Sequence, residues 1–184
     1  MKKIILAFLL FIKLTTVAFG QDGHERLRWS PTRELTLSDF TIKTKQLEAT
    51  TSFGQFYIAY KVQGFDFMTK NFNKKVDNFF IKSASWIDTT SNIQQLLTYQ
   101  QTLFDISEIY ARQFRKALHD NRKKIISGTN FIEELDQKYI SDFSKRRIDY
   151  DRETKFGTDI EKQKEWEKQI QKELSDLKDF DYDK

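Results

Sequence analysis

The hydrophobic pattern of the chain changes period near residue 91, and this change restricts the fold more than any other feature. Before it, Phe56, Ile58 and Tyr60 alternate with Tyr57 and Ala59, as expected of a strand with one buried face. After it, apolar side chains recur at helical spacing. Strands followed by helices indicate an α+β domain with a mostly antiparallel N-terminal sheet and three C-terminal helices.

Turn and capping residues set the expected boundaries of these elements. Strand candidates lie within residues 26–40, 56–62 and 76–87. Ser91 with Gln94 forms a capping box that opens a helix ending near residue 118, and Asn130 with Glu133 forms a second one. The third helix is expected over residues 158–177. Its inner face is expected to carry Ile160, Trp166, Ile170 and Leu174.

Charged residues on these helices have simple interpretations. Arg112, Arg115 and Lys116 lie in the last turns of the first helix, where cations complement the helix dipole. The charged run 161–172 is interpreted as a solvated face. Residues 179–184 alternate acidic and aromatic side chains. They are expected to form a flexible tail, with a short docking peptide as the alternative.

The N-terminal residues have the pattern of an export signal. Lys2 and Lys3 precede an apolar run, and small residues lie near position 20, so residues 1–20 are expected to be a signal peptide and residues 21–178 one domain. The run is too short for a membrane helix. Export to the periplasm or the medium is therefore predicted, without an integral membrane segment after cleavage.

Composition excludes several classes of function. Removing Lys2, Lys3 and Lys13 from the 31 basic residues leaves 28 against 27 acidic ones, so a balanced surface gives no reason to expect nucleic acid. The chain has no cysteine, which excludes thiolate catalysis and thiolate metal sites. It also has no Gly-rich phosphate loop and no Gly-x-Ser-x-Gly nucleophile elbow.

The segment from Leu96 to Ile106 is similar to a zinc-protease helix without its reactive residues. An active helix of this kind reads His-Glu-x-x-His, with two ligands one turn apart and a glutamate that activates water. Tyr99, Gln100 and Leu103 occupy those three positions here. On this motif alone, an ordinary core-facing helix is the favoured interpretation.

Flanking residues give this helix a family resemblance. Trp86, Leu96, Leu97, Gln101, Phe104, Asp105, Ile106, Glu108, Ala111 and Arg112 follow in the order seen in the bacterial family of secreted zinc-dependent proteases (domain of unknown function 922). A second segment of that family reads Tyr-Asp-x-x-Thr-x-His-Gly, followed by a Gln and a Trp. This chain matches it at Tyr150, Asp151, Thr154, Gly157, Gln163 and Trp166, with Phe156 in place of the histidine. The resemblance extends from about residue 29 to residue 166.

The resemblance implies a zincin-like fold that has lost its metal. It places the two helix ligands at Tyr99 and Leu103, the general base at Gln100 and the third ligand at Phe156. Because an emptied metal site would leave a polar hole, Tyr99, Leu103 and Phe156 are expected to pack against one another. No cofactor and no metal are expected.

Other groups could still carry chemistry. His24 and His119 are far apart in sequence, and His119 is interpreted as a solvent-facing residue at a helix end. Asp105 and Glu108 match acids of the family framework, where hydrogen bonds that support the ligands are the simpler role. Together with Trp86 and Tyr150, they are the candidates to line the groove.

Three functions follow from these patterns. The first is an exported, catalytically inactive relative of a zinc peptidase that binds a peptide or protein, or serves envelope assembly; its groove would lie beside an edge strand leading to Trp86, where an extended peptide could add. The second is a peptidase or other hydrolase that uses different residues, or a metal supplied through carboxylates, and that depends on Asp105 or Glu108. The third is a structural envelope protein whose old groove is closed over Tyr99 and Phe156. The sequence does not set the oligomeric state.

Overall fold

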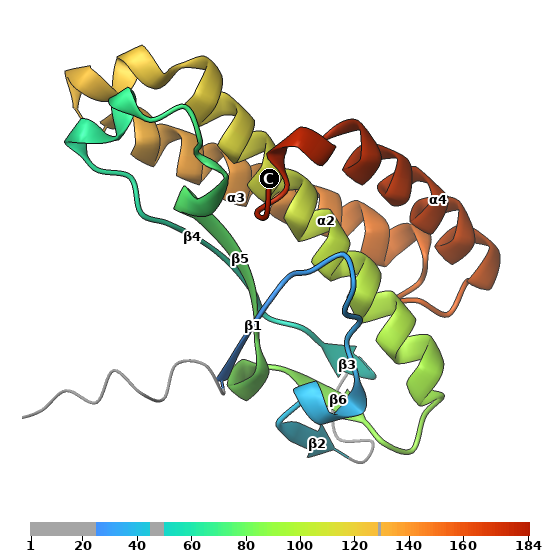
Figure 1. The fold of residues 1–184 in the computed structure, drawn as a ribbon. Helices are drawn as coiled ribbons and strands as arrows, with labels where there is room; N and C mark the ends of the chain where they lie inside the picture. The colour runs from blue at the N-terminus through green and yellow to red at the C-terminus, as the bar shows by residue number, and fades with distance from the viewer. Residues whose placement is uncertain (1–24, 45–49, 129) are drawn as a thin grey trace, which may run out of the picture.

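A computed structural model describes residues 25–44, 50–128 and 130–184. The strands are β1 (Arg26–Arg28), β2 (Ile42–Thr44), β3 (Ser52–Phe53), β4 (Phe56–Tyr60), β5 (Val76–Ile81) and β6 (Trp86–Asp88), and the helices are α2 (Ile93–Asp120), α3 (Asn130–Glu153) and α4 (Ile160–Asp176). Figure 1 shows α2 between the strands on one side and α3 and α4 on the other. The predicted α+β class is therefore confirmed. The predicted signal peptide lies outside the described residues.

The larger sheet contains the strand that alternation predicted. Its order is β1-β5-β4, with both pairs antiparallel, and Phe56 of β4 lies opposite Phe80 of β5. Phe56 and Ile58 are buried while Tyr57 is half exposed. One face of this sheet therefore supplies core side chains, as a period of two residues requires.

The smaller sheet corrects one prediction. Its order is β2-β6-β3, with β2 parallel and β3 antiparallel to β6. Trp86 opens β6 and lies opposite Ile42 on one side and Phe53 on the other. The segment at Trp86 is thus a central strand, so the prediction of an edge strand that accepts an added peptide there is wrong.

Helix α2 starts one residue later than its capping box predicted. The N-cap is Asn92, whose side chain accepts a hydrogen bond from the backbone N–H of Gln95 at 3.3 Å. From Thr102 to Ile109 every residue of α2 is buried, because β5, α3 and α4 all pack against it. Polar side chains in this stretch therefore need partners inside the protein.

The start of α3 and both ends of α4 agree with the predicted boundaries within about two residues. Helix α4 begins after Asp159, whose carboxylate accepts from the backbone N–H of Lys162 at 3.2 Å. Ile170 and Leu174 are buried as predicted, whereas Ile160 is 45% exposed. Ile160 is the first residue of α4. The buried side chains of this helix lie farther along it, where α4 packs on α2.

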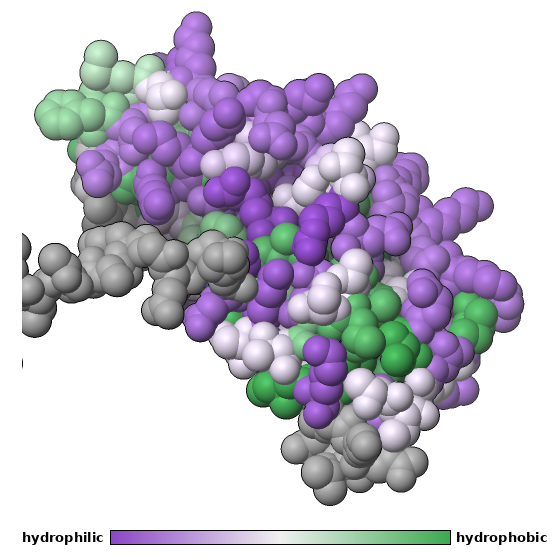
Figure 2. All heavy atoms as spheres, turned by 60° about the horizontal axis from the view of Figure 1, so that its bottom comes forward, coloured by the Kyte–Doolittle hydropathy of each residue, from purple (hydrophilic) through white to green (hydrophobic). Residues whose placement is uncertain are grey.

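The core consists of two clusters that meet along α2. Four phenylalanine rings, Phe40, Phe56, Phe80 and Phe104, pack with centroid separations of 5.1–6.1 Å between neighbours. The second cluster surrounds Phe114. On the face in Figure 2, hydrophobic side chains show only in patches among hydrophilic ones. Among the described residues, no helix is both long and apolar enough to cross a membrane.

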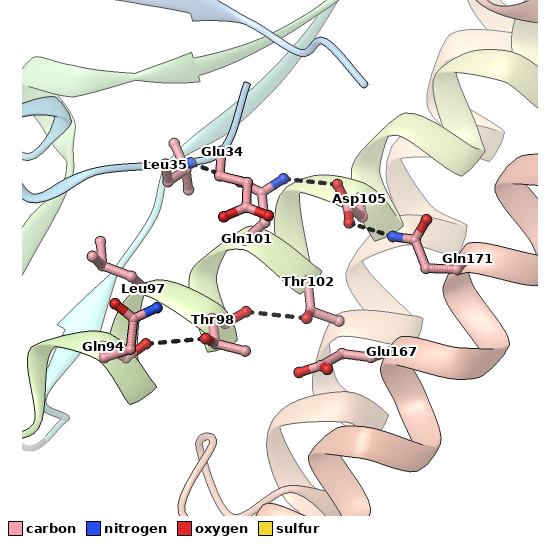
Figure 3. A pocket seen from close by; sticks show the side chains of 10 residues that line it. All are labelled: Glu34, Leu35, Gln94, Leu97, Thr98, Gln101, Thr102, Asp105, Glu167 and Gln171. Atoms are coloured by element: carbon pink, nitrogen blue, oxygen red, sulfur yellow. Dashed lines mark hydrogen bonds between the residues drawn. The ribbon is translucent and has the colours of Figure 1, made fainter. Parts of the chain in front are cut away.

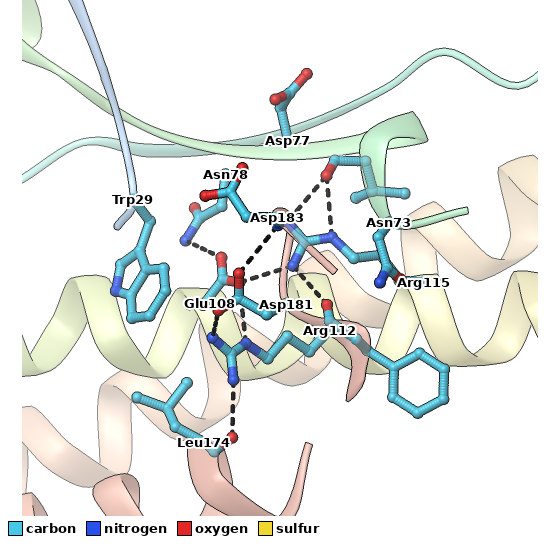
Figure 4. A network of polar contacts seen from close by, with 12 residues as sticks. Trp29, Asn73, Asp77, Asn78, Glu108, Arg112, Arg115, Leu174, Asp181 and Asp183 are labelled. Atoms are coloured by element: carbon cyan, nitrogen blue, oxygen red, sulfur yellow. Dashed lines mark hydrogen bonds and ion pairs between the residues drawn. The ribbon is translucent and has the colours of Figure 1, made fainter. Parts of the chain in front are cut away.

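Residues 179–184 do not have the structure expected of a free tail. Lys178–Phe180 forms a turn of 3-10 helix after α4, and Figure 4 shows the following residues beside α2. The Arg112 guanidinium donates to the carboxylate of Asp181, and the side-chain amide of Asn73 donates to the carbonyl of Asp179 at 3.0 Å. The tail is held by side chains distant in sequence, which a local pattern cannot reveal.

Candidate functional site

The four positions that the resemblance assigns to zinc chemistry lie near one another but do not form one cluster. Tyr99, Gln100 and Leu103 are buried in α2, with exposures of 3%, 0% and 0%. Phe156 lies in the turn between α3 and α4, is 48% exposed and belongs to neither core cluster. The prediction that Tyr99, Leu103 and Phe156 pack against one another is therefore wrong for Phe156.

Tyr99 occupies a neutral, stacked environment. Its ring lies 5.2 Å from that of Tyr150 at an interplanar angle of 11°, and its hydroxyl donates to Asp151, which also pairs with Arg147 at 3.7 Å. Burial, together with the adjacent Asp151 carboxylate, raises the pKa of Tyr99 well above its usual range. The phenol therefore stays protonated, which makes it a poor metal ligand.

The second segment of the resemblance builds the turn that covers Tyr99. The Tyr150 hydroxyl donates to Gln163 at 2.6 Å, and the Trp166 ring meets the Tyr150 ring edge-on at 5.3 Å. The Thr154 hydroxyl donates to the Tyr150 carbonyl at 2.7 Å and accepts from the Gly157 N–H at 3.2 Å. The matched residues thus fix one another in a single structural unit.

Gly157 is required by both conformation and space. Its φ is +81°, and a Cβ atom at this position would lie 2.7 Å from the Cβ of Tyr99. The Gly157 carbonyl also accepts from the side chain of Gln95 at 2.7 Å. The turn therefore closes directly over Tyr99, so this chain itself fills the predicted groove there. That observation favours the structural alternative at this position.

Gln100 occupies the position of the general base, but it is packed inside the protein and hydrogen-bonded to another side chain. Its amide donates to the Ser52 hydroxyl at 2.9 Å. Its Oε1 is buried without a hydrogen-bond partner among the described residues, and a Cβ on Gly54 would lie 2.5 Å from that oxygen. Close approach of the backbone at Gly54 thus packs the amide into the protein. An amide does not ionise, so Gln100 cannot act as a base.

The donor set at these positions does not fit zinc. Leu103 and Phe156 have no donor atom, and the hydroxyl of Tyr99 is bound to Asp151. Within residues 25–44, 50–128 and 130–184, no three His, Asp or Glu side chains are grouped as metal ligands. His119 is 44% exposed beside Asp120, as predicted for a helix end, and His24 lies outside the described residues.

Asp105 is a buried acidic side chain whose surroundings raise its pKa. It is 7% exposed and accepts from the Trp29 indole at 2.8 Å, from Gln101 at 2.9 Å and from Gln171 at 3.1 Å. Burial raises the pKa of Asp105 to about 6, although the hydrogen bonds from Trp29 and Gln101 act to lower it. Figure 3 shows this carboxylate between α2 and α4.

Asp105 lines a pocket between α2, α4 and the segment before residue 36. The pocket has a volume of about 200 Å³ and contains no Lys, Arg or His in its lining, which consists of Glu34, Leu35, Gln94, Leu97, Thr98, Gln101, Thr102, Asp105, Glu167 and Gln171. A second hollow of about 520 Å³ shares Glu34, Gln101, Asp105 and Gln171 with it and continues toward Arg112 and Asp181. We call the first of these the Asp105 pocket.

Glu108, predicted beside Asp105 as a groove residue, instead organises a buried ion network (Figure 4). Its Oε1 accepts from Arg112 at 3.1 Å and from Arg115 at 2.7 Å, and its Oε2 accepts from Asn78 at 3.3 Å. Arg115 also donates twice to the Val76 carbonyl, at 3.0 and 2.9 Å. The network ties α2 to β5.

Sequence reasoning missed the role of these arginines. Arg112 and Arg115 are 4% and 1% exposed, whereas they were interpreted as cations that complement the helix dipole. Arg112 follows Glu108 by four residues and Arg115 follows it by seven, so all three share a helix face. This spacing of one acidic and two basic residues along a single face is the signal that could have revealed a buried cluster.

Comparisons with known protein families, with curated proteins and with solved structures give no match to this chain. The resemblance to the secreted zinc-dependent proteases therefore stays a prediction that rests on the residues themselves.

Proposed function

We propose that this chain is an exported, non-catalytic binding domain on a peptidase-like framework, and that its Asp105 pocket holds a lysine or arginine side chain of another protein. The observation that carries the proposal is the lining of this pocket. Three carboxylates, Glu34, Asp105 and Glu167, contribute to it without any cationic residue. A charge of opposite sign is the natural complement of such a surface.

The size of the pocket also favours a side chain over a larger ligand. Its volume of about 200 Å³ is below the range of about 300 to 1,000 Å³ typical of small-molecule sites. Leu35 and Leu97 supply apolar surface for an aliphatic stem, as long basic side chains require. The amides and hydroxyls of the lining provide acceptors around an ammonium or guanidinium group.

The Asp105 carboxylate can accept a further hydrogen bond in this pocket. A carboxylate offers about four acceptor positions, and Trp29, Gln101 and Gln171 use three of them. Because burial holds its pKa near 6, a cation that approaches the remaining position favours the ionised form. Binding is therefore expected to strengthen as the pH rises through 6.

The test uses titration calorimetry with blocked five-residue peptides that carry a central Lys, Gln or Glu among glycines. The Lys peptide is expected to bind at pH 7.5, and the Asp105→Asn variant is expected to bind it at least about tenfold more weakly. Glu161→Gln is the matched control, because the Glu161 side chain is 82% exposed and does not line the Asp105 pocket. Equal binding of the Gln peptide, or no binding of the Lys peptide at millimolar concentration, would overturn the proposal.

A hydrolase remains the second candidate, because a carboxyl group with a pKa near 6 suits general acid–base chemistry. Glu108 is a weaker candidate, since two arginines hold it away from the Asp105 pocket. The same Asp105→Asn variant separates the two functions. Cleavage of the Lys peptide by the wild type, lost in the variant, supports the enzyme; binding without cleavage supports the binding domain.

A further inference from the structure

The tail contacts a set of side chains that together form a peptide site. We call this set the tail seat; it consists of Arg28, Asn73, Arg112 and Arg115. Besides the Asn73 and Arg112 contacts described above, Arg115 donates to the Phe180 carbonyl at 3.0 Å, and the Arg28 guanidinium lies 4.3 Å from the centre of the Tyr182 ring. Two of these contacts involve backbone carbonyls, one a carboxylate and one an aromatic face.

The charges of the tail seat require an anion. Arg112 and Arg115 are both more than nine-tenths buried, and both pair with the single carboxylate of Glu108. Asp181 supplies the second negative charge through Arg112. A buried guanidinium without a counter-charge is strongly unfavourable, so the seat selects for a carboxylate at this position.

The tail is held by polar contacts rather than by core packing. Phe180 and Tyr182 belong to neither hydrophobic cluster, and Asp179 is exposed. Segments with few buried apolar contacts open at low free-energy cost compared with core elements. The tail can therefore leave its seat while the helices stay folded, provided that another carboxylate takes the place of Asp181 beside Arg112.

We propose that the tail seat is a receptor for a peptide segment in which acidic and aromatic residues alternate, and that residues 179–183 occupy it as an exchangeable internal ligand. A partner protein with a segment of the same chemistry displaces the tail and takes over the contacts with Arg112, Arg115 and Arg28. This site is separate from the lysine-binding role of the Asp105 pocket, and either can fail without the other.

The test uses the full chain and a blocked peptide with the sequence of residues 178–184. The internal ligand is weakened by Asp181→Asn, and Asp179→Asn is the matched control, because among the described residues only the backbone carbonyl of Asp179 has a hydrogen-bond partner. A peptide with asparagine at all three aspartate positions tests the need for carboxylates. Binding is followed by fluorescence anisotropy of labelled peptide.

The Asp181→Asn chain is expected to bind the peptide at least about tenfold more tightly than the wild type and the Asp179→Asn chain, because a tethered ligand competes at millimolar effective concentration. The all-asparagine peptide is expected to bind none of them. Equal affinity for all three chains, or no binding to a folded Asp181→Asn chain, would overturn the proposal.

If the Asp181→Asn chain does not fold, the proposal is tested by amide hydrogen exchange of the wild type with and without the peptide. Millimolar peptide is expected to speed exchange at residues 178–184 at least about threefold as the tail is displaced. Unchanged exchange there refutes the proposal.

Discussion

The two ends of α2 use opposite means to fix the elements around them. At the N-terminal end, Tyr99 holds the α3–α4 turn through ring stacking on Tyr150 and close contact with Gly157. Toward the C-terminal end, Glu108 holds β5 and the tail through Arg112 and Arg115. The first end depends on shape, and the second depends on buried charge.

This difference shows where the molecule can respond to its surroundings. Burial raises the pKa values of Tyr99 and Tyr150 above the usual range, so both phenols keep their protons at every physiological pH. Asp105 titrates near pH 6, and the arginine network depends on counter-charges. Binding and regulation are therefore expected at the charged end, and the positions that match a metal site are expected to be structural.

Glu108→Gln should produce the largest effect, because it leaves two buried guanidinium groups with only Asp181 as counter-charge. We expect a loss of roughly 3 to 5 kcal/mol in the free energy of unfolding, measured by urea denaturation. Glu165→Gln is the control, since Glu165 is 65% exposed in its pair with Lys162 and should cost less than about 1 kcal/mol. A loss below about 1 kcal/mol for Glu108→Gln would contradict the importance of charge at this end.

Asp105→Asn should change how stability depends on pH. The folded pKa of about 6 is above the ordinary value of 3.8 for an aspartate, so the contribution of Asp105 is present below about pH 4 and is lost as the pH rises through about 6. Relative to Asp105→Asn, the wild type is expected to lose roughly 3 kcal/mol between pH 4 and pH 7. Parallel denaturation series across this pH range measure the difference.

Asp39 gives the matched case of opposite sign. Although burial acts to raise it, hydrogen bonds from Arg33, Lys82 and Thr36 lower the pKa of Asp39 to about 2. Its contribution is therefore present above about pH 4 and lost as the pH falls through 2. The Asp39→Asn variant should be less stable than the wild type at pH 7, and this difference should disappear as the pH falls through 2. If the stability of the wild type relative to Asp39→Asn instead falls with rising pH, as expected relative to Asp105→Asn, this account of the two carboxylates is wrong.

Gly157→Ala tests the shape-dependent end. An alanine would have to adopt a φ near +81° with its Cβ against Tyr99, and we expect a loss of about 1 to 3 kcal/mol. The near-ultraviolet circular dichroism of the stacked tyrosines should also change. Gly128→Ala is the control, because its φ is +126° but nothing lies within 4 Å of the added Cβ; it should leave this spectrum as in the wild type.

Tyr99→Phe should have the smallest effect. It keeps the stack on Tyr150 and removes only the hydrogen bond to Asp151, so a loss of about 1 kcal/mol is expected from thermal or urea unfolding. Tyr57→Phe, at a half-exposed ring, should change stability by less than about 0.5 kcal/mol. A larger loss for Tyr99→Phe than for Gly157→Ala would show that polar bonding, rather than shape, dominates this end.

The helices were predictable because their signals are local. Periodicity and capping residues place both ends of α2 and α4 and the start of α3 within about two residues, with Asn92 and Asp159 as the observed caps of α2 and α4. The hydrogen-bond partners of Gln100 and Asp105 could not be predicted in this way. Both face elements that lie more than 45 residues away in sequence, at Ser52 and Trp29.

The site was predicted only in part, because its side chains also meet residues that are distant in sequence. Tyr99 and the segment from Tyr150 to Gly157 do meet in space, as the resemblance implied. Phe156 has a positive φ of 56° and is 48% exposed, and no sequence pattern indicated either property. Pairing of Trp86 on both sides depends on β2, an element 44 residues earlier, so its central position could not be deduced from the strand alone.

The fluorescence of Trp29 can report on two sites of the protein at once. Its indole N–H is bonded to Asp105, and the Arg112 guanidinium lies 5.0 Å from its ring. One chromophore therefore contacts both the carboxylate that titrates near pH 6 and the arginine that holds the tail. With Trp86 and Trp166 replaced by Phe, the emission of Trp29 should separate proton uptake at one site from peptide exchange at the other without any added label.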